Sequence, residues 1–339
     1  MKHILTQYGL PEKSKLIPLV SGLINSTWKV VDDERKYILQ KINDGVFKKP
    51  FHLAENIRMI GDHLKTHSPD YLFVSTIPTI SGEDLFHDNA GFFRLFPFIE
   101  SSHTVDVVTT PDEAYEAASQ FGRFTKELAS FEATKLNITI PGFHNLTLRY
   151  HQFKESLTHG NQERIRESKK LIQAVDKFEW ILKQFESIEN NPAVKIRVAH
   201  HDTKISNVLF DYNNKGLCVI DLDTVMPGYF ISDVGDMMRT YLSPANEEVK
   251  SFDEIMVRTE FYDAIVAGYL SAMNNELTPD EKKLIPYSGF FLTYMQALRF
   301  LTDHFNNDRY YGARYQGHNF VRAGNQLVLL EQMAEVLPR

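Results

Sequence analysis

Two stretches near the middle of the chain decide its fold. Residues 200–211 have the sequence HHDTKISNVLFD and residues 217–223 have the sequence LCVIDLD, with the turn-forming residues YNNKG between them. An apolar run, a polar turn and a second apolar run predict a β-hairpin. In this hairpin Asn207 lies level with about Ile220, next to Asp221. The pattern therefore predicts that an amide oxygen and a carboxylate meet at one end of the hairpin.

The residues at this end of the hairpin have the chemistry of phosphoryl transfer. Asp202, on the loop that enters the first strand, can approach the same end from outside. Amide and carboxylate oxygens are hard ligands that suit Mg²⁺, which takes its remaining ligands from phosphates and water. A further carboxylate nearby can accept a hydroxyl proton. Asp202, Asn207 and Asp221 together therefore predict a phosphotransferase.

The sequence before the hairpin has the pattern of a small sheet. Residues 27–31 and 36–41 surround a turn and predict a β-hairpin, and residues 71–74 and 91–96 predict further antiparallel strands. A helix is expected over 50–64, where proline is followed by apolar residues spaced three or four apart. This part is therefore expected to be mainly β with a single helix.

The pattern becomes helical after Thr110. Residues 110–113 form a capping sequence with proline at the first helical position, and residues 162–188 have apolar residues at helical spacing. The fold class is therefore predicted to be α+β in two lobes, 1–100 and 101–339. The larger, mainly helical lobe carries the catalytic hairpin.

The composition excludes several classes of protein. The 339 residues carry a formal charge of −7 with a pI near 6.0. The chain therefore lacks the excess positive charge with which proteins bind a nucleic-acid backbone. A hydrophobic content of 43% excludes disorder of the whole chain. Neither a membrane-spanning stretch nor a secretory signal is expected, and the single Cys218 cannot form an intramolecular disulfide. We therefore expect a cytoplasmic monomer or homodimer without nucleic-acid or membrane partners.

The hairpin region also resembles a known family. Residues 201–207, followed by 219–221, are similar to the catalytic loop and metal aspartate of the aminoglycoside phosphotransferase and choline kinase superfamily, small-molecule relatives of protein kinases. The longer set that adds residues 220–228 and 233–236 is similar to the N-acetylhexosamine 1-kinases within it. The resemblance implies a bilobal, protein-kinase-like fold over nearly the whole chain.

The resemblance implies a role for each matching position around the hairpin. Asp202 matches the base that positions and deprotonates the acceptor hydroxyl. Asn207 and Asp221 match the magnesium ligands, and Asp223 stands where another carboxylate supports them or holds a second ion. The aspartates of residues 233–236 match a brace of the catalytic loop.

The resemblance extends to a loop that covers the nucleotide phosphates. Residues 21–28 match this loop, in which Gly22 allows a backbone bend. Asn25, Ser26 and Thr27 offer hydrogen-bond donors to phosphate oxygens. An ordinary hairpin turn is the alternative interpretation.

One position departs from the family pattern. The strand after this loop usually carries a basic residue where this chain has Gln40, and strand alternation sends Lys41 to the opposite face. Either Lys41 reaches the phosphates through a bulge or at the strand end, with Glu55 as its ion-pair partner, or Gln40 binds them more weakly and the metal carries more charge. A solvated Lys41 is the third possibility. The adenine is expected against the hinge, at Phe98 and Ile99.

The acceptor pocket is expected in the helical lobe, where residues 299–322 mix aromatic, charged and amide side chains. Aromatic planes suit the apolar face of a sugar ring, and the polar groups suit its hydroxyls. The alternative is an ordinary helix followed by a polar loop. The candidate substrate-binding residues are Asp202, Thr224, Arg299, Asp303, Tyr310 and Arg322.

These observations predict a kinase that uses ATP and Mg²⁺ and acts on a small molecule. The expected acceptor is the anomeric hydroxyl of an N-acetylhexosamine (GlcNAc or GalNAc), with choline, ethanolamine or homoserine as alternatives. Two other classes stay open: a metal-dependent hydrolase that uses His200 and His201, and a pseudokinase. The hydrolase needs further histidines at ligand spacing, and a pseudokinase is expected to lack Asp202, Asn207 or Asp221.

Overall fold

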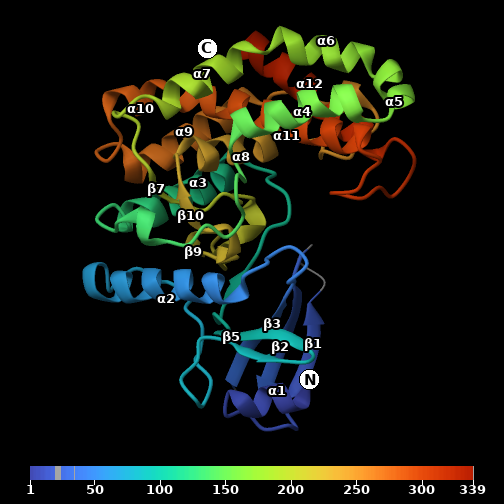
Figure 1. Cartoon of the computed structure of the whole chain (residues 1–339). Coiled ribbons are helices and arrows are strands. Elements are labelled where there is room, and N and C mark those ends of the chain that lie inside the picture. The colour runs from blue at the N-terminus through green and yellow to red at the C-terminus, as the bar shows by residue number, and fades with distance from the viewer. Residues whose placement is uncertain (20–23, 34, 339) are drawn as a thin grey trace.

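The computed structural model describes residues 1–19, 24–33 and 35–338. A small antiparallel sheet lies at one end of the molecule and a larger helical part at the other, with helix α2 between them (Figure 1). This arrangement confirms the predicted α+β fold class.

The small sheet contains five strands in the order β1-β2-β3-β5-β4, and every neighbouring pair is antiparallel. The strands are β1 Lys15–Leu19, β2 Ser26–Asp32, β3 Arg35–Ile42, β4 Phe86–Asp88 and β5 Gly91–Pro97. The hairpin predicted around residues 32–35 is therefore present. The strand predicted over 71–74 is wrong, because this segment is irregular and buries Tyr71 in the core of the helical part instead of pairing with the sheet.

A short helix, α1 (Lys2–Gln7), covers one face of the sheet, so the expectation of a single helix in this region is also wrong. Its Ile4 and Leu5 are buried against Leu39 and Leu95 of the sheet. The helix is six residues long and its N-cap makes no side-chain hydrogen bond. It therefore lacks the length and the capping signal on which helix prediction depends.

Helix α2 (Pro50–His67) begins at the predicted proline and joins the two parts. Ile57, Ile60 and Leu64 of this helix belong to the core of the helical part. The Asn56 amide donates to the carbonyl of Val225, with N···O 3.1 Å. The helix is therefore anchored next to the DLD sequence of residues 221–223.

The remaining elements belong to the helical part. Its strands are β6 Ser102–His103, β7 Arg197–Ala199, β8 Val208–Asp211, β9 Gly216–Val219 and β10 Met226–Gly228. Its α-helices are α3 Pro111–Glu127, α4 Leu146–His159, α5 Gln162–Glu167, α6 Lys169–Lys177, α7 Trp180–Glu189, α8 Ile231–Tyr241, α9 Thr259–Met273, α10 Pro279–Lys283, α11 Ile285–Phe305 and α12 His318–Val336. Single 3₁₀ turns are η1 Ala133–Lys135, η2 Ile205–Asn207, η3 Leu222–Thr224 and η4 Phe252–Glu254.

Two features of this part were predicted. Thr110 and Glu113 form the expected capping box at the start of α3. The helical stretch 162–188 is present, divided into three helices. Helix α11 forms the centre of the core and packs against α8 and α12.

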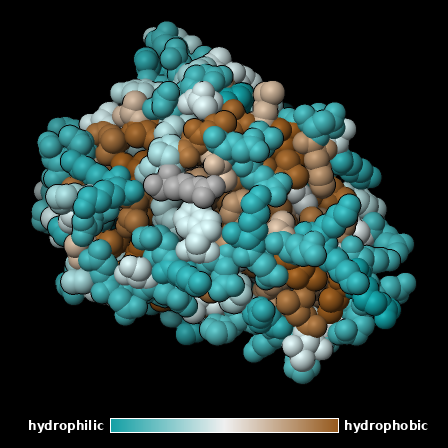
Figure 2. Space-filling view, turned by 90° about the horizontal axis from the view of Figure 1, so that it is seen from above, coloured by the Kyte–Doolittle hydropathy of each residue, from teal (hydrophilic) through white to brown (hydrophobic). Residues whose placement is uncertain are grey.

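The surface of the helical part mixes hydrophobic and hydrophilic residues. Figure 2 shows brown hydrophobic patches separated by teal hydrophilic side chains on the face seen from above. Among the described residues, no helix combines the length and the apolar character that crossing a membrane requires.

Candidate active site

The catalytic hairpin has the predicted register. Val208 pairs with Val219, and the amide of Ile220 donates to the carbonyl of Asn207, with N···O 2.8 Å. Asn207 therefore lies level with Ile220 and close to Asp221, as the spacing predicted. Strand β6 extends the hairpin to a sheet of three strands.

Helix α8 braces the loop that enters this hairpin. Asp233 accepts hydrogen bonds from the backbone amides of His200 and His201, at 2.9 and 2.7 Å. Asp236 accepts one from the backbone amide of Thr203 at 2.8 Å. These bonds confirm the predicted brace, and they hold His201 in a left-handed conformation with φ of 65°.

Asp202 lies within this braced segment, between His201 and Thr203, and is partly exposed. Its Oδ1 lies 3.1 Å from the Nζ of Lys204. Burial opposes protonation of Lys204, but the carboxylates of Asp202 and Asp236 raise its pKa above the usual range. Sequence reasoning did not select Lys204, although it stands two positions after Asp202 in the same motif.

Asn207 and Asp221 have the donor chemistry of a magnesium site. The Asn207 amide nitrogen donates to the backbone carbonyl of Asp202 at 2.9 Å, which leaves its side-chain oxygen as the ligand atom. Asp221 has φ of 60° and its side chain reaches solvent. In the described part of the chain no group of three or more His, Cys, Asp or Glu could hold a metal ion alone. The pair fits Mg²⁺, which needs few protein oxygens when phosphates supply others.

The electrostatic setting of Asp221 is strongly acidic. Surrounding protein limits its hydration, and the nearby carboxylates of Asp223 and Asp202 add repulsion. Together these raise the pKa of Asp221 to about 7, although Arg94 and Lys204 oppose the shift. A cation at this position would relieve the repulsion.

Asp223 occupies a different place from the one predicted for a metal ligand. It is buried, and Arg94 on β5 donates to its Oδ1 while Asn25 donates to its Oδ2 at 2.7 Å. Both carboxylate oxygens are therefore engaged by residues of the sheet. Asp223 joins the two parts of the molecule, and Asn207 and Asp221 remain the predicted metal ligands.

The structure does not support Lys41 and Glu55 as a nucleotide-binding ion pair. Lys41 lies on the sheet face that packs against α1, with its Nζ 5.9 Å from the ring centre of Phe93. Glu55 is exposed and accepts a hydrogen bond from Asn137 at 2.9 Å. No bulge interrupts β3, because its pairing with β2 and β5 is regular throughout. Strand alternation therefore keeps Lys41 away from the cleft.

The described residues of the loop that is predicted to cover the phosphates lie at the start of strand β2. Thr27 lies opposite Gln40 and its hydroxyl accepts from the Gln40 amide at 3.3 Å. Ser26 is exposed, and Asn25 accepts from the backbone amide of Asn43 at 3.0 Å as well as donating to Asp223. The prediction for Gly22 lies outside the described residues.

At the hinge, Phe98 and Ile99 follow strand β5. The Phe98 ring lies 3.9 Å from the Nζ of Lys29, and the carbonyl of Ile99 accepts from the Ser102 hydroxyl at 2.7 Å. Lys29 was not selected from the sequence. It projects from β2 on the face opposite Val30, which is buried towards α1. The hinge residues therefore border the cleft side of the sheet.

A cavity of about 540 Å³ lies between α4, α11 and the loop after α11. Arg299, Asp303 and Tyr310, three of the predicted acceptor residues, line it. Tyr311, which belongs to the predicted region 299–322, also lines it, and so does Arg149, which the sequence argument did not select. The region that is predicted to bind the acceptor therefore contains a cavity.

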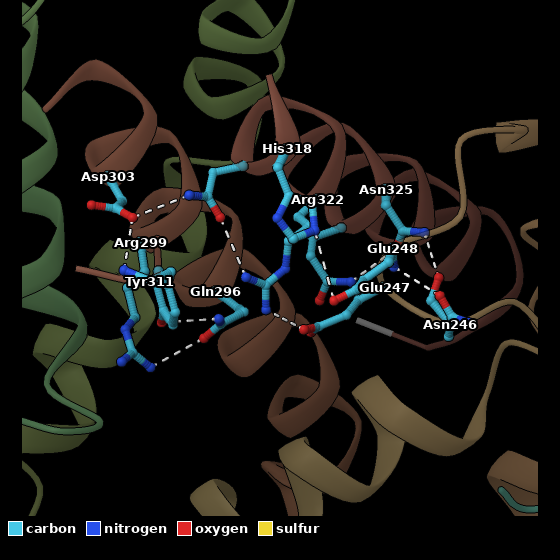
Figure 3. A network of polar contacts seen from close by, with 12 residues as sticks. Asn246, Glu247, Glu248, Gln296, Arg299, Asp303, Tyr311, His318, Arg322 and Asn325 are labelled. Carbon is cyan, nitrogen blue, oxygen red and sulfur yellow. Dashed lines mark hydrogen bonds and ion pairs between the residues drawn. The ribbon is translucent and has the colours of Figure 1, made fainter. Parts of the chain in front are cut away.

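Asp303 and the other predicted acceptor residues have supporting contacts. Asp303 accepts from the backbone amides of Tyr310 and Tyr311 at 2.7 and 2.9 Å, so it shapes the loop. Arg322 pairs with Glu247 (Figure 3). Thr224 is buried and donates to the carbonyl of His200 at 2.7 Å. Its hydroxyl is therefore used inside the fold, which corrects its assignment as a substrate contact.

Aromatic residues connect the cavity to the catalytic loop. The Arg299 guanidinium lies 5.3 Å from the ring centre of Phe143, which stacks on His144 at 4.4 Å. The Nδ1 of His144 lies 3.2 Å from that of His201, the residue before Asp202. A chain of side-chain contacts therefore leads from Arg299 of the cavity to His201, the neighbour of Asp202 in the sequence.

The two histidines before Asp202 are part of the core. His200 is buried against Phe121 and Phe124, and its Nε2 lies 2.9 Å from the carbonyl of Ile220. His201 faces His144, as described above. The ring contacts described here for His200 and His201 are made with residues other than Asp221. The arrangement therefore favours phosphoryl transfer over a metal centre built from histidines.

Comparison with known proteins agrees with this geometry. The sequence model of the phosphotransferase enzyme family matches residues 15–279. The chain is similar in structure to a microcompartment-associated aminopropanol kinase (20% identity, TM-score 0.66, 98% of this chain and 96% of that chain). It is also similar to a spectinomycin phosphotransferase solved with ADP and spectinomycin (11%, 0.62, 99% and 97%). An ethanolamine kinase from Plasmodium vivax shares the fold as well (15%, 0.58, 96% and 87%).

Proposed function

The chain belongs to the phosphotransferase enzyme family, and on that premise we propose that it is an ATP- and Mg²⁺-dependent kinase of a small hydroxyl compound. The observation that carries the proposal is the convergence of Asp202, Asn207 and Asp221 at one end of the braced hairpin. The similarity to a phosphotransferase solved with ADP supports an adenine nucleotide.

Each of these side chains has a part in the proposed reaction. The Asp202 carboxylate accepts the proton of the acceptor hydroxyl, and Lys204 holds that carboxylate by an ion pair at 3.1 Å. Asn207 and Asp221 would hold Mg²⁺, which supplies the positive charge that the phosphates require. The bonds from Asp233 and Asp236 fix the loop, so that Asp202 does not have to be ordered when the substrates bind.

We place the acceptor in the cavity beside Arg299. Arg149, Arg299 and Arg309 line it, whereas of its two acidic residues Asp303 is already satisfied by backbone amides. Glu155 is the other acidic residue. An excess of guanidinium groups disfavours a cationic acceptor and favours a neutral, hydroxyl-rich one.

The acceptor that fits this description is an N-acetylhexosamine, phosphorylated at its anomeric hydroxyl. Tyr310 and Tyr311 offer ring surfaces to the apolar face of a sugar, and Arg149 and Arg299 offer donors to its oxygens. The second candidate acceptor is an amino alcohol, because an aminopropanol kinase and an ethanolamine kinase share the fold.

An acceptor panel tests the proposal. ADP formation is measured with GlcNAc, GalNAc, aminopropanol, ethanolamine, choline and homoserine, each with and without Mg²⁺. We expect Mg²⁺-dependent ADP formation with an N-acetylhexosamine, and a rate lower by about 10²–10⁴ in Asp202→Asn because the base is lost. Asp211→Asn, at the other end of the same hairpin, is the matched control and retains activity.

The outcomes separate the alternatives. ADP formation only with amino alcohols would replace the sugar acceptor and leave the kinase assignment in place. Release of phosphate without an acceptor would indicate a hydrolase. Nucleotide binding without turnover on any acceptor would indicate a pseudokinase, and undiminished activity of Asp202→Asn would refute the role of that carboxylate.

A further inference from the structure

The basic residue expected on strand β3 has an equivalent on the neighbouring strand. Gln40 on β3 is paired directly with Arg94 on β5. Leu39 and Leu95, the next residues along, pack towards α1 on the other face of the sheet. Gln40 and Arg94 therefore lie side by side on the face that borders the cleft.

The contacts of Arg94 fix its guanidinium group. The Nε and Nη2 atoms both donate to the Gln40 side-chain oxygen, at 3.1 and 2.9 Å, and Nη1 donates to Asp223. The Gln40 amide is itself oriented by its bond to the Thr27 hydroxyl. Arg94 is only 1% exposed, so this cation is held in one place by three hydrogen bonds to two partners.

The identity of residue 40 follows from this arrangement. A lysine at that position would place a second cation against the guanidinium and would remove the oxygen that accepts two of its hydrogen bonds. Glutamine supplies that oxygen and adds no charge. Gln40 is therefore the partner that a cation on β5 requires, rather than a weak substitute for a lysine.

Asp223 places the same cation beside the catalytic residues. It stands two positions after Asp221, and its second oxygen is bound by Asn25 from the phosphate-covering loop. The bonds to Gln40 and Asp223 use three of the five N–H groups of Arg94. Through Asp223 the guanidinium is therefore linked to Asn25, in the loop predicted to cover the phosphates, and to the segment that carries Asp221.

We propose that Arg94 is the cation that binds the nucleotide phosphates, with Gln40 and Asp223 as its positioning residues. The inference rests on the proposed function, because it concerns the nucleotide of that same site. It assigns to β5 a charge that the family pattern places on β3, and it excludes Lys41 from the role.

Nucleotide binding tests this assignment without an acceptor. The dissociation constants of ADP and of adenosine are measured by calorimetry for the wild type, Arg94→Met, Arg94→Met/Asp223→Asn and Lys41→Met. We expect ADP to bind about 10- to 100-fold more weakly to both Arg94 variants, with adenosine unchanged, since only the proposed attraction between Arg94 and the phosphates is lost. Lys41→Met, which removes the cation on the opposite face, binds both ligands normally.

Two double variants, one of them new to the panel, guard against a purely structural explanation. Arg94→Met/Asp223→Asn leaves no unpaired charge, and thermal unfolding establishes that each variant is folded. Gln40→Lys/Arg94→Met moves the cation to β3, and we expect it to recover most of the ADP affinity.

The results decide between the explanations. ADP affinity within about twofold of wild type in the charge-balanced variant, or an equal loss of ADP and adenosine affinity, would overturn the assignment of Arg94. Weakened ADP binding by Lys41→Met alone would move the role to Lys41. A wild-type protein that binds neither ligand would instead refute the proposed function itself.

Discussion

His201 has a backbone conformation that few residues other than glycine and asparagine adopt readily, with φ of 65°. Its ring is buried, and its Nδ1 lies 3.2 Å from the Nδ1 of His144, so one ring donates and the other accepts. Burial, together with the neighbouring His200, lowers the pKa of His201 to about 4. Protonation would place two donors face to face in a buried contact.

This histidine pair predicts a loss of stability in acid. The pKa of His201 is lower in the folded protein than its ordinary 6.5, so the unfolded chain takes up the proton first as the pH falls. The stability is complete above about pH 6.5 and is lost progressively towards pH 4. We expect the free energy of unfolding to decrease by about 2 kcal/mol from this residue between pH 8 and pH 5.

Urea unfolding at a series of pH values measures this effect. His201→Asn is the matched variant, because asparagine tolerates the left-handed backbone and does not titrate. It is expected to show a shallower dependence of unfolding free energy on pH. An identical dependence in the two proteins would contradict the role given to His201.

At the scale of secondary-structure elements, helix α8 determines the shape of the catalytic loop. Asp233 and Asp236 brace the loop, and Gly235 lies between them. A Cβ atom on Gly235 would lie 2.3 Å from the backbone carbonyl oxygen of Ser288 on α11. The two helices therefore approach each other as closely as they do because this residue has no side chain.

Gly235→Ala is expected to destabilise the protein and to reduce its activity. A backbone oxygen cannot move aside as a side chain can, so α8 must shift and take both aspartates with it. We expect a loss of about 1–3 kcal/mol in unfolding free energy and a lower kcat. Gly289→Ala is the control in the same helix pair, since its Cβ would meet the flexible Met238 side chain at 3.0 Å. Equal effects of the two substitutions on stability and kcat would contradict this explanation.

The elements also show what could be predicted from the sequence. Asn207 and Asp221 lie in one hairpin, so turn residues and strand alternation were enough to bring them together. Arg94 and Gln40 are 54 positions apart, and their contact depends on the pairing of β3 with β5. No local pattern specifies that pairing. The sequence therefore indicated a missing cation at Gln40 without revealing where the cation lies.

At the scale of the whole molecule, α2 connects the sheet to the helical part through a buried amide. Asn56 donates to the carbonyls of Asn137 and Val225, at 2.9 and 3.1 Å, and accepts from the backbone amide of Asn137 at 2.8 Å. The neighbouring Glu55, which the sequence argument selected, is exposed. Helical periodicity identified the buried face of α2, but not the amide that anchors it, because its partners come from distant loops.

Asn56→Ala is expected to weaken this connection. It leaves buried backbone groups without partners, and we expect the free energy of unfolding to decrease by about 2–3 kcal/mol. Glu55→Ala changes it by no more than about 0.5 kcal/mol, as exposed positions usually do, and leaves the KM for ATP unchanged. Denaturant unfolding and ATP saturation curves for the two variants provide the check. A larger effect of Glu55→Ala would restore that residue to the nucleotide site.

The contacts at residues 223–225 have a consequence for the speed of the reaction cycle. Arg94 and Asn25 bind Asp223, and Asn56 binds the carbonyl of Val225, so the sheet and α2 both hold this short segment of the helical part. Separating the two parts would bring a buried ion pair into water. If ADP can leave only when the two parts separate, the release of ADP has the same activation barrier as this separation. The turnover rate would then report the release of ADP rather than the transfer of phosphate.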